Sequence, residues 1–355
     1  MAQDANRQIY PLAFAIVDSE NDNSWSYFFQ HLRSAVPDEN GLIFVSDRHG
    51  SIFKGLRDNY IFAKHGCCTF HLFGNVKSRF KRSDLWGLYQ KANKAYTKQE
   101  FNLHFAQLCR ESKEVGDYLK GVGFQSWARS HMCANRFNIM TSNNAESINS
   151  RLKGPRRLPL IGLIDGIMSV MMKWFYERRE KGKSCSEVLT PTLCGELEVN
   201  YLRSLTMVVS RLNQYEFQVH SNGHTFLVNI SARTCYCNAF QIDQIPCPHA
   251  TAAAKSCGVD PVQLVHPFFT AENWREAYKE TVYPVPSFVR WEVPEHIMNK
   301  TCLPPNVRRP PGRPRKNRIP SRGEYRGPKR RCGSCGILGH NNRNCPNPSR
   351  SSAAP

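Results

Sequence analysis

Four side chains that commonly bind metal ions lie within fifteen residues in the second half of the chain. They form two close pairs, Cys235 with Cys237 and Cys247 with His249. Zinc prefers four thiolate or imidazole ligands in a tetrahedron, which a Cys-x-Cys pair at a strand end and a Cys-x-His pair entering a helix can supply. Four unrelated buried side chains are the alternative, which the paired spacing disfavours. The spacing predicts a structural zinc site.

A second group of such residues lies near the C-terminus, in the spacing of a zinc knuckle. Its members are Cys332, Cys335, His340 and Cys345. Gly336 and Gly339 stand where tight turns are needed. Because so short a segment has almost no hydrophobic core, the metal ion itself would supply the folding free energy. Zinc knuckles commonly contact single-stranded nucleic acid, and protein contact is the alternative.

Basic residues are concentrated in the same part of the chain. The last 55 residues hold 13 Lys and Arg against one acid, and so carry +12 of the net charge of +19. A polyanionic partner follows, and nucleic acid is the default; a basic tail kept for solubility is the alternative. The residues that we expect to contact DNA are Arg308, Arg309, Gly312, Arg313, Pro314, Arg315, Lys316 and Arg318.

Within this stretch, Gly312-Arg313-Pro314 resembles the core of an AT-hook. An extended Arg-Pro segment can lie in the narrow minor groove of A·T-rich DNA, and proline lowers the cost of ordering it. A nuclear import signal and a solvated run of charge are the alternatives. Together with the basic residues of 326–331, the stretch predicts residence in the nucleus.

Composition limits the class of protein. Hydrophobic residues make up 41% of the 355 residues, enough for two or three folded domains. We expect no membrane span and no secretory signal, because apolar runs are short or interrupted by charges. The 14 cysteines therefore indicate a reducing compartment rather than a disulfide framework.

The apolar pattern of the first half predicts alternating strands and helices. Strands are expected at 10–17 and 42–45, with an amphipathic helix at 24–36 between them. Residues 142–180 read as helical with a break at Gly154-Pro155. Strand-like runs joined by the turn Ser221-Asn222-Gly223 and a helix at 248–256 follow. An α/β layered domain with a smaller second domain is the expected architecture.

Two carboxylates and a Cys-x-x-His pair recur at element ends in the first half. Asp47 ends the strand at 42–45, Cys68 and His71 follow a further strand-like stretch, and Glu146 opens a helix. Each has a structural alternative. Asp47 could cap the next helix, Glu146 could belong to a capping box, and the Cys-x-x-His pair could serve packing.

Taken in series, these features resemble the Mutator-like transposase domain, which has an RNase H-like fold. The later pattern around Ile245–Ala250 resembles the SWIM-type zinc finger, and the finger, Arg-Pro linker and knuckle follow in the same order in that plant family. The family uses three carboxylates to hold two divalent cations, Mg²⁺ or Mn²⁺. The resemblance makes Asp47 the second acid and Glu146 the third.

The resemblance also predicts where the chain departs from the family. The family's first acid lies on a strand before the segment matching Gln3–Leu12, and Asp4, Asp18, Asp22 and Asp38 do not occupy its place. We therefore expect a domain incomplete at its N-terminus that is inactive as a nuclease. An active transposase with an incomplete gene model, a domesticated transcription regulator and a protein-interaction adaptor are the alternatives.

The expected segments, in chain order, are a partial RNase H-like domain with a helical insertion (1–180), a helical connector (181–214), a SWIM-type finger region (215–285), a disordered basic linker (286–331), a CCHC knuckle (332–345) and a disordered tail (346–355). The expected ligands are two structural Zn²⁺ ions, DNA, and single-stranded nucleic acid at the knuckle.

Overall fold

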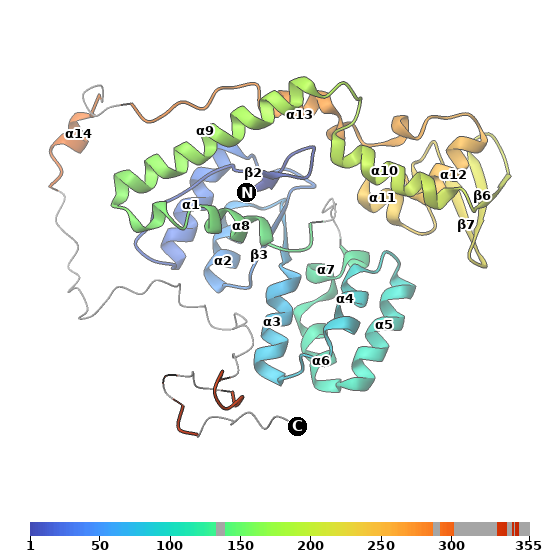
Figure 1. Ribbon diagram of the computed structural model, residues 1–355, viewed down its shortest axis with the longest axis horizontal. Coiled ribbons are helices and arrows are strands. Elements are labelled where there is room, and N and C mark those ends of the chain that lie inside the picture. Colours follow the sequence, from blue (N-terminus) through green and yellow to red (C-terminus); the bar gives the residue numbers. More distant parts are fainter. Residues whose placement is uncertain (133–138, 287–291, 302–331, 339–342, 344, 348–355) are drawn as a thin grey trace, which may run out of the picture.

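The structure is a computed structural model, and it describes residues 1–355 except 133–138, 287–291, 302–331, 339–342, 344 and 348–355 (Figure 1). An N-terminal α/β layer, a bundle of short helices and a small finger region are visible in Figure 1, with the long helix α9 (Leu160–Ser184) along one side. The chain is thus a mixed α/β protein, as the sequence pattern predicted.

The N-terminal layer is built from two small sheets and two helices. Its elements are β1 (Ala2–Gln3), β2 (Ile9–Tyr10), α1 (Asp22–Ala35), β3 (Ile43–Ser46), α2 (Gly50–Asn59) and β4 (Lys64–Cys67). β1 and β2 form an antiparallel hairpin, and β3 pairs in parallel with β4. The apolar faces of α1 and α2 pack together through Phe29, Leu32 and Leu56. The predicted strand–helix–strand order is confirmed here.

The expected strand at 10–17 is wrong beyond its first residue. β2 ends at Tyr10, and residues 11–17 form no strand. Pro11 has no N–H to donate to a ladder, and 11–17 pair with no strand among the described residues. Every residue of this run is apolar, but Leu12, Ile16 and Val17 are each more than 40% exposed. An apolar run alone does not make a strand without a partner edge.

The second body is a helical bundle. It comprises α3 (Thr69–Phe80), α4 (Trp86–Lys94), α5 (Lys98–Glu111), α6 (Lys113–Val122), α7 (Phe124–Trp127) and a 3₁₀ turn (Arg129–His131). Side-chain caps begin two of the helices: Thr97 Oγ1 accepts the Glu100 N–H and Ser112 Oγ accepts the Val115 N–H. The core of the bundle contains fully buried rings, among them Tyr89, Phe101 and Trp127.

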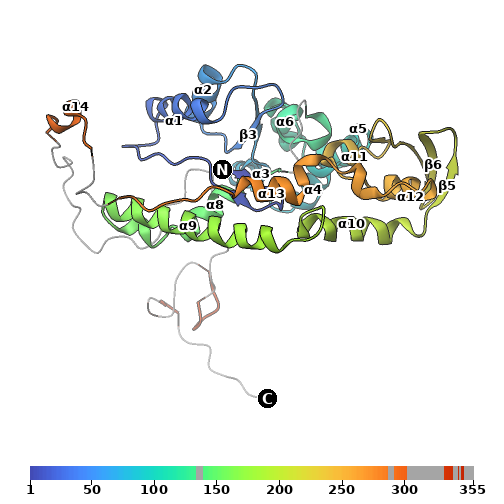
Figure 2. The ribbon, with the colours of Figure 1, turned by 90° about the horizontal axis from the view of Figure 1, so that it is seen from above.

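Two long helices join this bundle to the finger. α8 (Asn143–Arg151) and a 3₁₀ turn (Pro155–Arg157) precede α9, and α10 (Pro191–Ser204) follows it. Figure 2 shows α9 and α10 lying nearly end to end along one side of the molecule. α9 runs through residue 180, where we expected a domain boundary. Among the described residues, no helix is both long enough and apolar enough to cross a membrane.

The finger region is a four-stranded antiparallel sheet covered by helices. Its elements are β5 (Val208–Arg211), β6 (Glu216–Ser221), β7 (His224–Asn229), β8 (Thr234–Cys235), α11 (Ala239–Asp243) and α12 (Pro248–Ser256). Asn222 and Gly223 join β6 to β7 with φ angles of +49° and +76°, the left-handed conformation of a tight hairpin turn. The predicted hairpin and the helix at 248–256 are confirmed.

The remaining described elements follow the finger. They are two 3₁₀ turns (Pro261–Leu264 and Pro267–Phe269), α13 (Ala271–Ala277) and α14 (Glu295–Met298). α13 packs back against α9, so the chain returns to the N-terminal layer after completing the finger.

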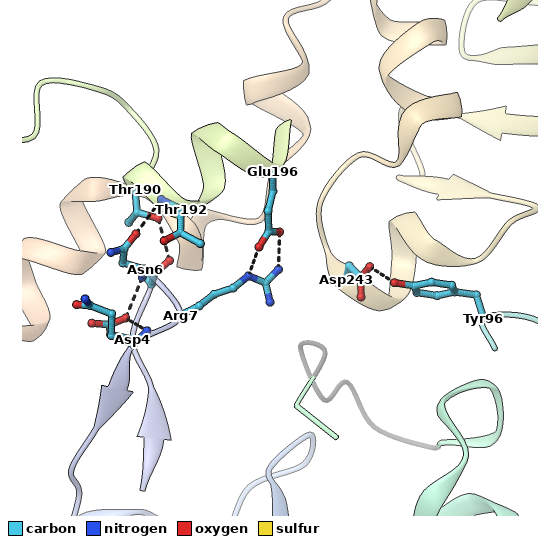
Figure 3. A network of polar contacts seen from close by, with 10 residues as sticks. Asp4, Asn6, Arg7, Tyr96, Thr190, Thr192, Glu196 and Asp243 are labelled. Carbon is cyan, nitrogen blue, oxygen red and sulfur yellow. Dashed lines mark hydrogen bonds and ion pairs between the residues drawn. The ribbon is translucent and has the colours of Figure 1, made fainter. Parts of the chain in front are cut away.

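The β1–β2 hairpin is held in place by residues of α10 and α13, which lie far from it in the sequence. Asp4, which is 4% exposed, accepts hydrogen bonds from Trp274 Nε1 at 3.1 Å and from the Tyr278 hydroxyl at 2.7 Å. Arg7 pairs with Glu196 of α10 at 2.8 Å (Figure 3). These contacts fix the first ten residues against α10 and α13.

Candidate functional site

The structure brings the first predicted ligand set together. One ligand atom from each of Cys235, Cys237, Cys247 and His249 lies within 4.8 Å of the others. Nδ1 of His249 is 3.7 Å from the sulfur of Cys235 and 3.9 Å from that of Cys247. A sulfur and a nitrogen bound to one tetrahedral zinc, at about 2.3 Å and 2.0 Å from the ion, would be roughly 3.5 Å apart. The side chains present therefore fit a zinc ion.

Local structure explains why these side chains converge. Cys235 ends β8, and Cys247 is the N-cap of α12, where its sulfur accepts the Ala250 N–H at 3.4 Å. His249 lies in the first turn of α12, and its ring stacks on Phe226 of β7 with centroids 3.8 Å apart. The sheet and the helix thus each deliver half of the ligand set, and Phe226 orients the imidazole.

Hydrogen bonds among the three thiols shift their pKa values in opposite directions. Hydrogen bonds from Cys235 and then Cys247 hold the pKa of the Cys237 thiol far below its ordinary value. The hydrogen bond to Cys237 raises the pKa of Cys235 to about 12, and the one to Cys235 raises that of Cys247. The cluster thus favours negative charge on its closely spaced thiols, which a divalent ion would neutralise.

Three of the four predicted knuckle ligands lie close together in the structure. The sulfurs of Cys332, Cys335 and Cys345 lie within 4.8 Å of one another. The Gly336 N–H donates to the Cys332 carbonyl at 2.8 Å, with Gly336 at φ +73°, so the tight turn predicted there is formed. The Ile337 backbone N–H, as the main cause, lowers the pKa of Cys335 to about 6. Three thiols in this arrangement fit a zinc knuckle.

Several predicted site residues fall outside the described residues. These are His340, the expected fourth ligand of the knuckle, Gly339, and the DNA-contact stretch Arg308–Arg318.

Asp47 lies where the sequence placed it, directly after β3. It is half-buried, and its carboxylate accepts the His49 N–H at 3.3 Å at the start of α2. The preceding Ser46 hydroxyl lies 2.8 Å from His65 Nε2 on the neighbouring strand β4. Asp47 thus stands at the carboxyl end of a parallel strand pair, the edge where α/β proteins place reactive groups.

The Cys-x-x-His pair bridges this edge to α8. The Cys68 N–H donates to the Ser46 carbonyl at 2.7 Å, and the Cys68 sulfur accepts the Ser142 N–H at 3.2 Å. His71 Nδ1 lies 3.3 Å from the Ser142 hydroxyl. Burial opposes ionisation of Cys68, but hydrogen bonds from His71 and Ser142 outweigh it and lower its pKa to about 7. The pair therefore ties the end of β3 to the residue before α8.

Glu146 is carried by α8, four residues after Ser142, and nothing further is described of its side chain. Among the described side chains, metal-binding groups gather only in the two cysteine clusters, and none gathers at Asp47.

Ser142 was not among the predicted site residues. The only sequence signal for it was its place directly before the helix of Glu146.

The finger also contacts the helical bundle in a way that the sequence did not indicate. The Tyr96 hydroxyl donates to Asp243 Oδ2 at 2.6 Å (Figure 3). Asn238 Nδ2 donates to the Tyr96 carbonyl at 3.2 Å. The Arg129 guanidinium lies over the Tyr96 ring at 4.4 Å. Because Asn238 follows Cys237 directly, the finger's metal-binding loop is part of this interface.

Comparisons with known families find matches in two parts of the chain, the N-terminal segment and the finger. The sequence model of the MULE transposase domain matches residues 1–75, and that of the SWIM zinc finger matches residues 226–258. No curated protein and no solved structure was found to match the chain. The chain thus has an N-terminal segment that matches the MULE transposase domain and a later segment that matches the SWIM zinc finger, and its second cysteine cluster fits a knuckle.

Proposed function

We propose that this chain is a zinc-binding, DNA-binding protein derived from a Mutator-like transposase, and that its N-terminal region is RNase H-like. The observation that carries the proposal is the convergence of four zinc-type ligands within 4.8 Å inside the SWIM-matched segment, behind a MULE-matched segment. Each cluster takes one structural Zn²⁺, which holds its fold together and takes no part in a reaction.

DNA is the proposed partner because of charge and family. The chain carries a net charge of +19, concentrated in the C-terminal segment that holds the Arg-Pro stretch and the knuckle. Counterion release by Lys and Arg makes such binding strong at low salt and steeply salt-dependent. Contact with A·T-rich minor groove at 308–318, with single strands at the knuckle, and residence in the nucleus belong to the same proposal.

Catalytic inactivity of the 355-residue polypeptide is proposed from the contacts of its acids. Asp4 is buried beneath Trp274 and Tyr278, and Asp38 accepts the N–H groups of Ile61, Phe62 and Ala63. Asp22 pairs with Lys54 and Ser51. Asp18 bonds Ser19 and Ser24. Each of these carboxylates makes other contacts, and among the described side chains no metal-binding group gathers with Asp47.

Three measurements test the proposal. Elemental analysis should find about two zinc ions per chain by the four-ligand rule. Duplex binding followed by anisotropy should weaken by about 10³-fold or more between 50 and 200 mM salt. A strand-transfer assay with Mg²⁺ should show no cleavage; cleavage that Glu146→Gln abolishes would show an active transposase instead.

The zinc measurement and the duplex-binding measurement each test a different part of the proposal. Absence of zinc with intact cysteines would remove the zinc assignment, and duplex affinity that does not respond to salt would remove the DNA assignment and favour a protein-interaction adaptor.

A further inference from the structure

A basic and aromatic groove includes Arg48, the residue that follows Asp47 in the chain. It has a volume of about 660 Å³, and its lining comes from the loop after β3, the C-terminal end of α3, and α6. The lining residues used below are Arg48, Arg79, Phe80, Tyr118 and Glu114. The groove is distinct from both cysteine clusters, and no motif of the sequence pointed to it.

The two arginines are arranged around one ring. The Arg48 Nη1 donates to the Tyr118 hydroxyl at 2.8 Å, and its guanidinium carbon lies 5.8 Å from the Tyr118 ring centre. The Arg79 guanidinium carbon lies 5.5 Å from the same ring and 5.3 Å from Phe80. The two guanidinium groups are therefore at most 11.3 Å apart. Aromatic faces hold them in place while their other N–H donors remain available.

The charge of the groove is not balanced within it. Glu114 is the one acid in the lining, and among the ion pairs of the described residues none joins it to Arg48 or Arg79. Lys77 and Lys81 add further positive charge at the same end of α3, next to Arg82, which pairs with Asp84. Two neighbouring cations repel one another unless an anion lies between them, and guanidinium groups match phosphate oxygens in pairs.

We propose that this groove binds the sugar-phosphate backbone of a DNA strand, with Arg48 and Arg79 on neighbouring phosphates and the Tyr118 ring against a base or sugar. The inference rests on the proposed function and deepens it, since it gives the transposase-derived region its own DNA contact apart from the basic C-terminal segment. Arg48 is the residue directly after Asp47, and Asp47 itself is not part of the lining. Positive charge with an aromatic platform is the usual means of holding single strands.

The experiment compares two double variants of the full chain that remove equal charge. Arg48→Ala/Arg79→Ala empties the groove of cations, and Arg110→Ala/Arg203→Ala removes two exposed arginines from α5 and α10. All four side chains are exposed, so both variants should fold, which circular dichroism checks. Affinity for a fluorescent single strand of about 20 nucleotides, longer than a typical single-strand binding site, is measured over a salt series. Ultraviolet cross-linking to a strand carrying 5-iodouracil, with peptide mapping, locates the contact.

The groove variant should bind about 5- to 20-fold more weakly than wild type at 100 mM salt. Its log–log salt slope should fall by roughly 1.4, or about 0.7 for each phosphate of a single strand that no longer has its arginine, and the control variant should stay near wild type. Wild type should cross-link within 113–122, the segment of Tyr118, and the groove variant should not. Equal weakening of both variants with no cross-link in 113–122 would overturn the groove while leaving DNA binding intact. A wild-type chain that binds no DNA would overturn the proposed function as well.

Discussion

Replacing Cys247 by Ser isolates what the metal contributes to the finger. Cys247 is 3% exposed, lies in the finger's core and caps α12 through the Ala250 N–H. Serine is a good N-cap, so the capping loss stays below about 1 kcal/mol. A structural zinc contributes about 10–16 kcal/mol, whereas a whole domain is stable by only about 5–15 kcal/mol. Loss of the ligand should therefore unfold residues 215–260 even though the cap survives.

Zinc content and hydrogen exchange together measure this effect. The variant should retain one zinc ion instead of two, because the knuckle is a separate cluster. Amide protection should vanish across 215–260 and persist in the bundle core at Tyr89 and Trp127. Cys257→Ser is the matched control, since its sulfur bonds the Ala254 carbonyl outside the cluster, and it should keep both ions. A Cys247→Ser chain that holds two ions, or loses both, would refute the reasoning.

Three further substitutions test contacts that tie the bodies together. The pKa of Cys68 falls from 9.0 to about 7 on folding. Its thiolate therefore adds to the free energy of unfolding, by an amount that grows between pH 7 and pH 9 to about 3 kcal/mol. This contribution is lost as the pH falls through 7. Urea unfolding of wild type and Cys68→Ala should thus diverge with rising pH; a pH-independent gap would contradict this. Tyr96→Phe leaves the half-buried Asp243 without its donor and should cost about 1–3 kcal/mol, seen as faster exchange at 238–243 with zinc retained. Asp4→Ala leaves two buried donors unpaired and should cost about 3 kcal/mol or more, releasing residues 1–10 to proteolysis, while the exposed Asp18→Ala should not.

Local signals predicted the finger well because its structure is determined by neighbouring residues. Cys247-Pro248 followed by an alanine-rich run specifies a capped helix, and α12 begins and ends at the predicted residues. Asn222-Gly223 specifies a tight hairpin turn, and both residues have positive φ. The spacing of the cysteines then requires the ligands to meet, so the cluster could be predicted without knowledge of the rest of the fold.

The same approach failed where a contact depends on distant residues. The run at 11–17 is apolar enough for a strand, but pairing requires a neighbouring edge that no local pattern specifies. Asp4 and Trp274 are 270 residues apart, and Tyr96 and Asp243 are 147 apart. Each pair consists of ordinary residue types with no spacing signal. Such contacts decide how the bodies sit together, and only the fold reveals them.

The Cys-x-x-His pair shows how a motif acquires a meaning from these distant contacts. In the sequence, Cys68 and His71 resembled a family element with no evident task. In the structure, the Cys68 backbone bonds Ser46, the residue before Asp47, and its sulfur bonds Ser142, the residue before the helix of Glu146. One residue thereby sets the distance between two segments that are nearly a hundred residues apart in the chain. Two carboxylates on such segments can serve a common site only if their supports keep a fixed separation. The side chains of the pair act on the other segment, because the Cys68 sulfur and the His71 imidazole both contact Ser142 and so hold the residue that precedes α8.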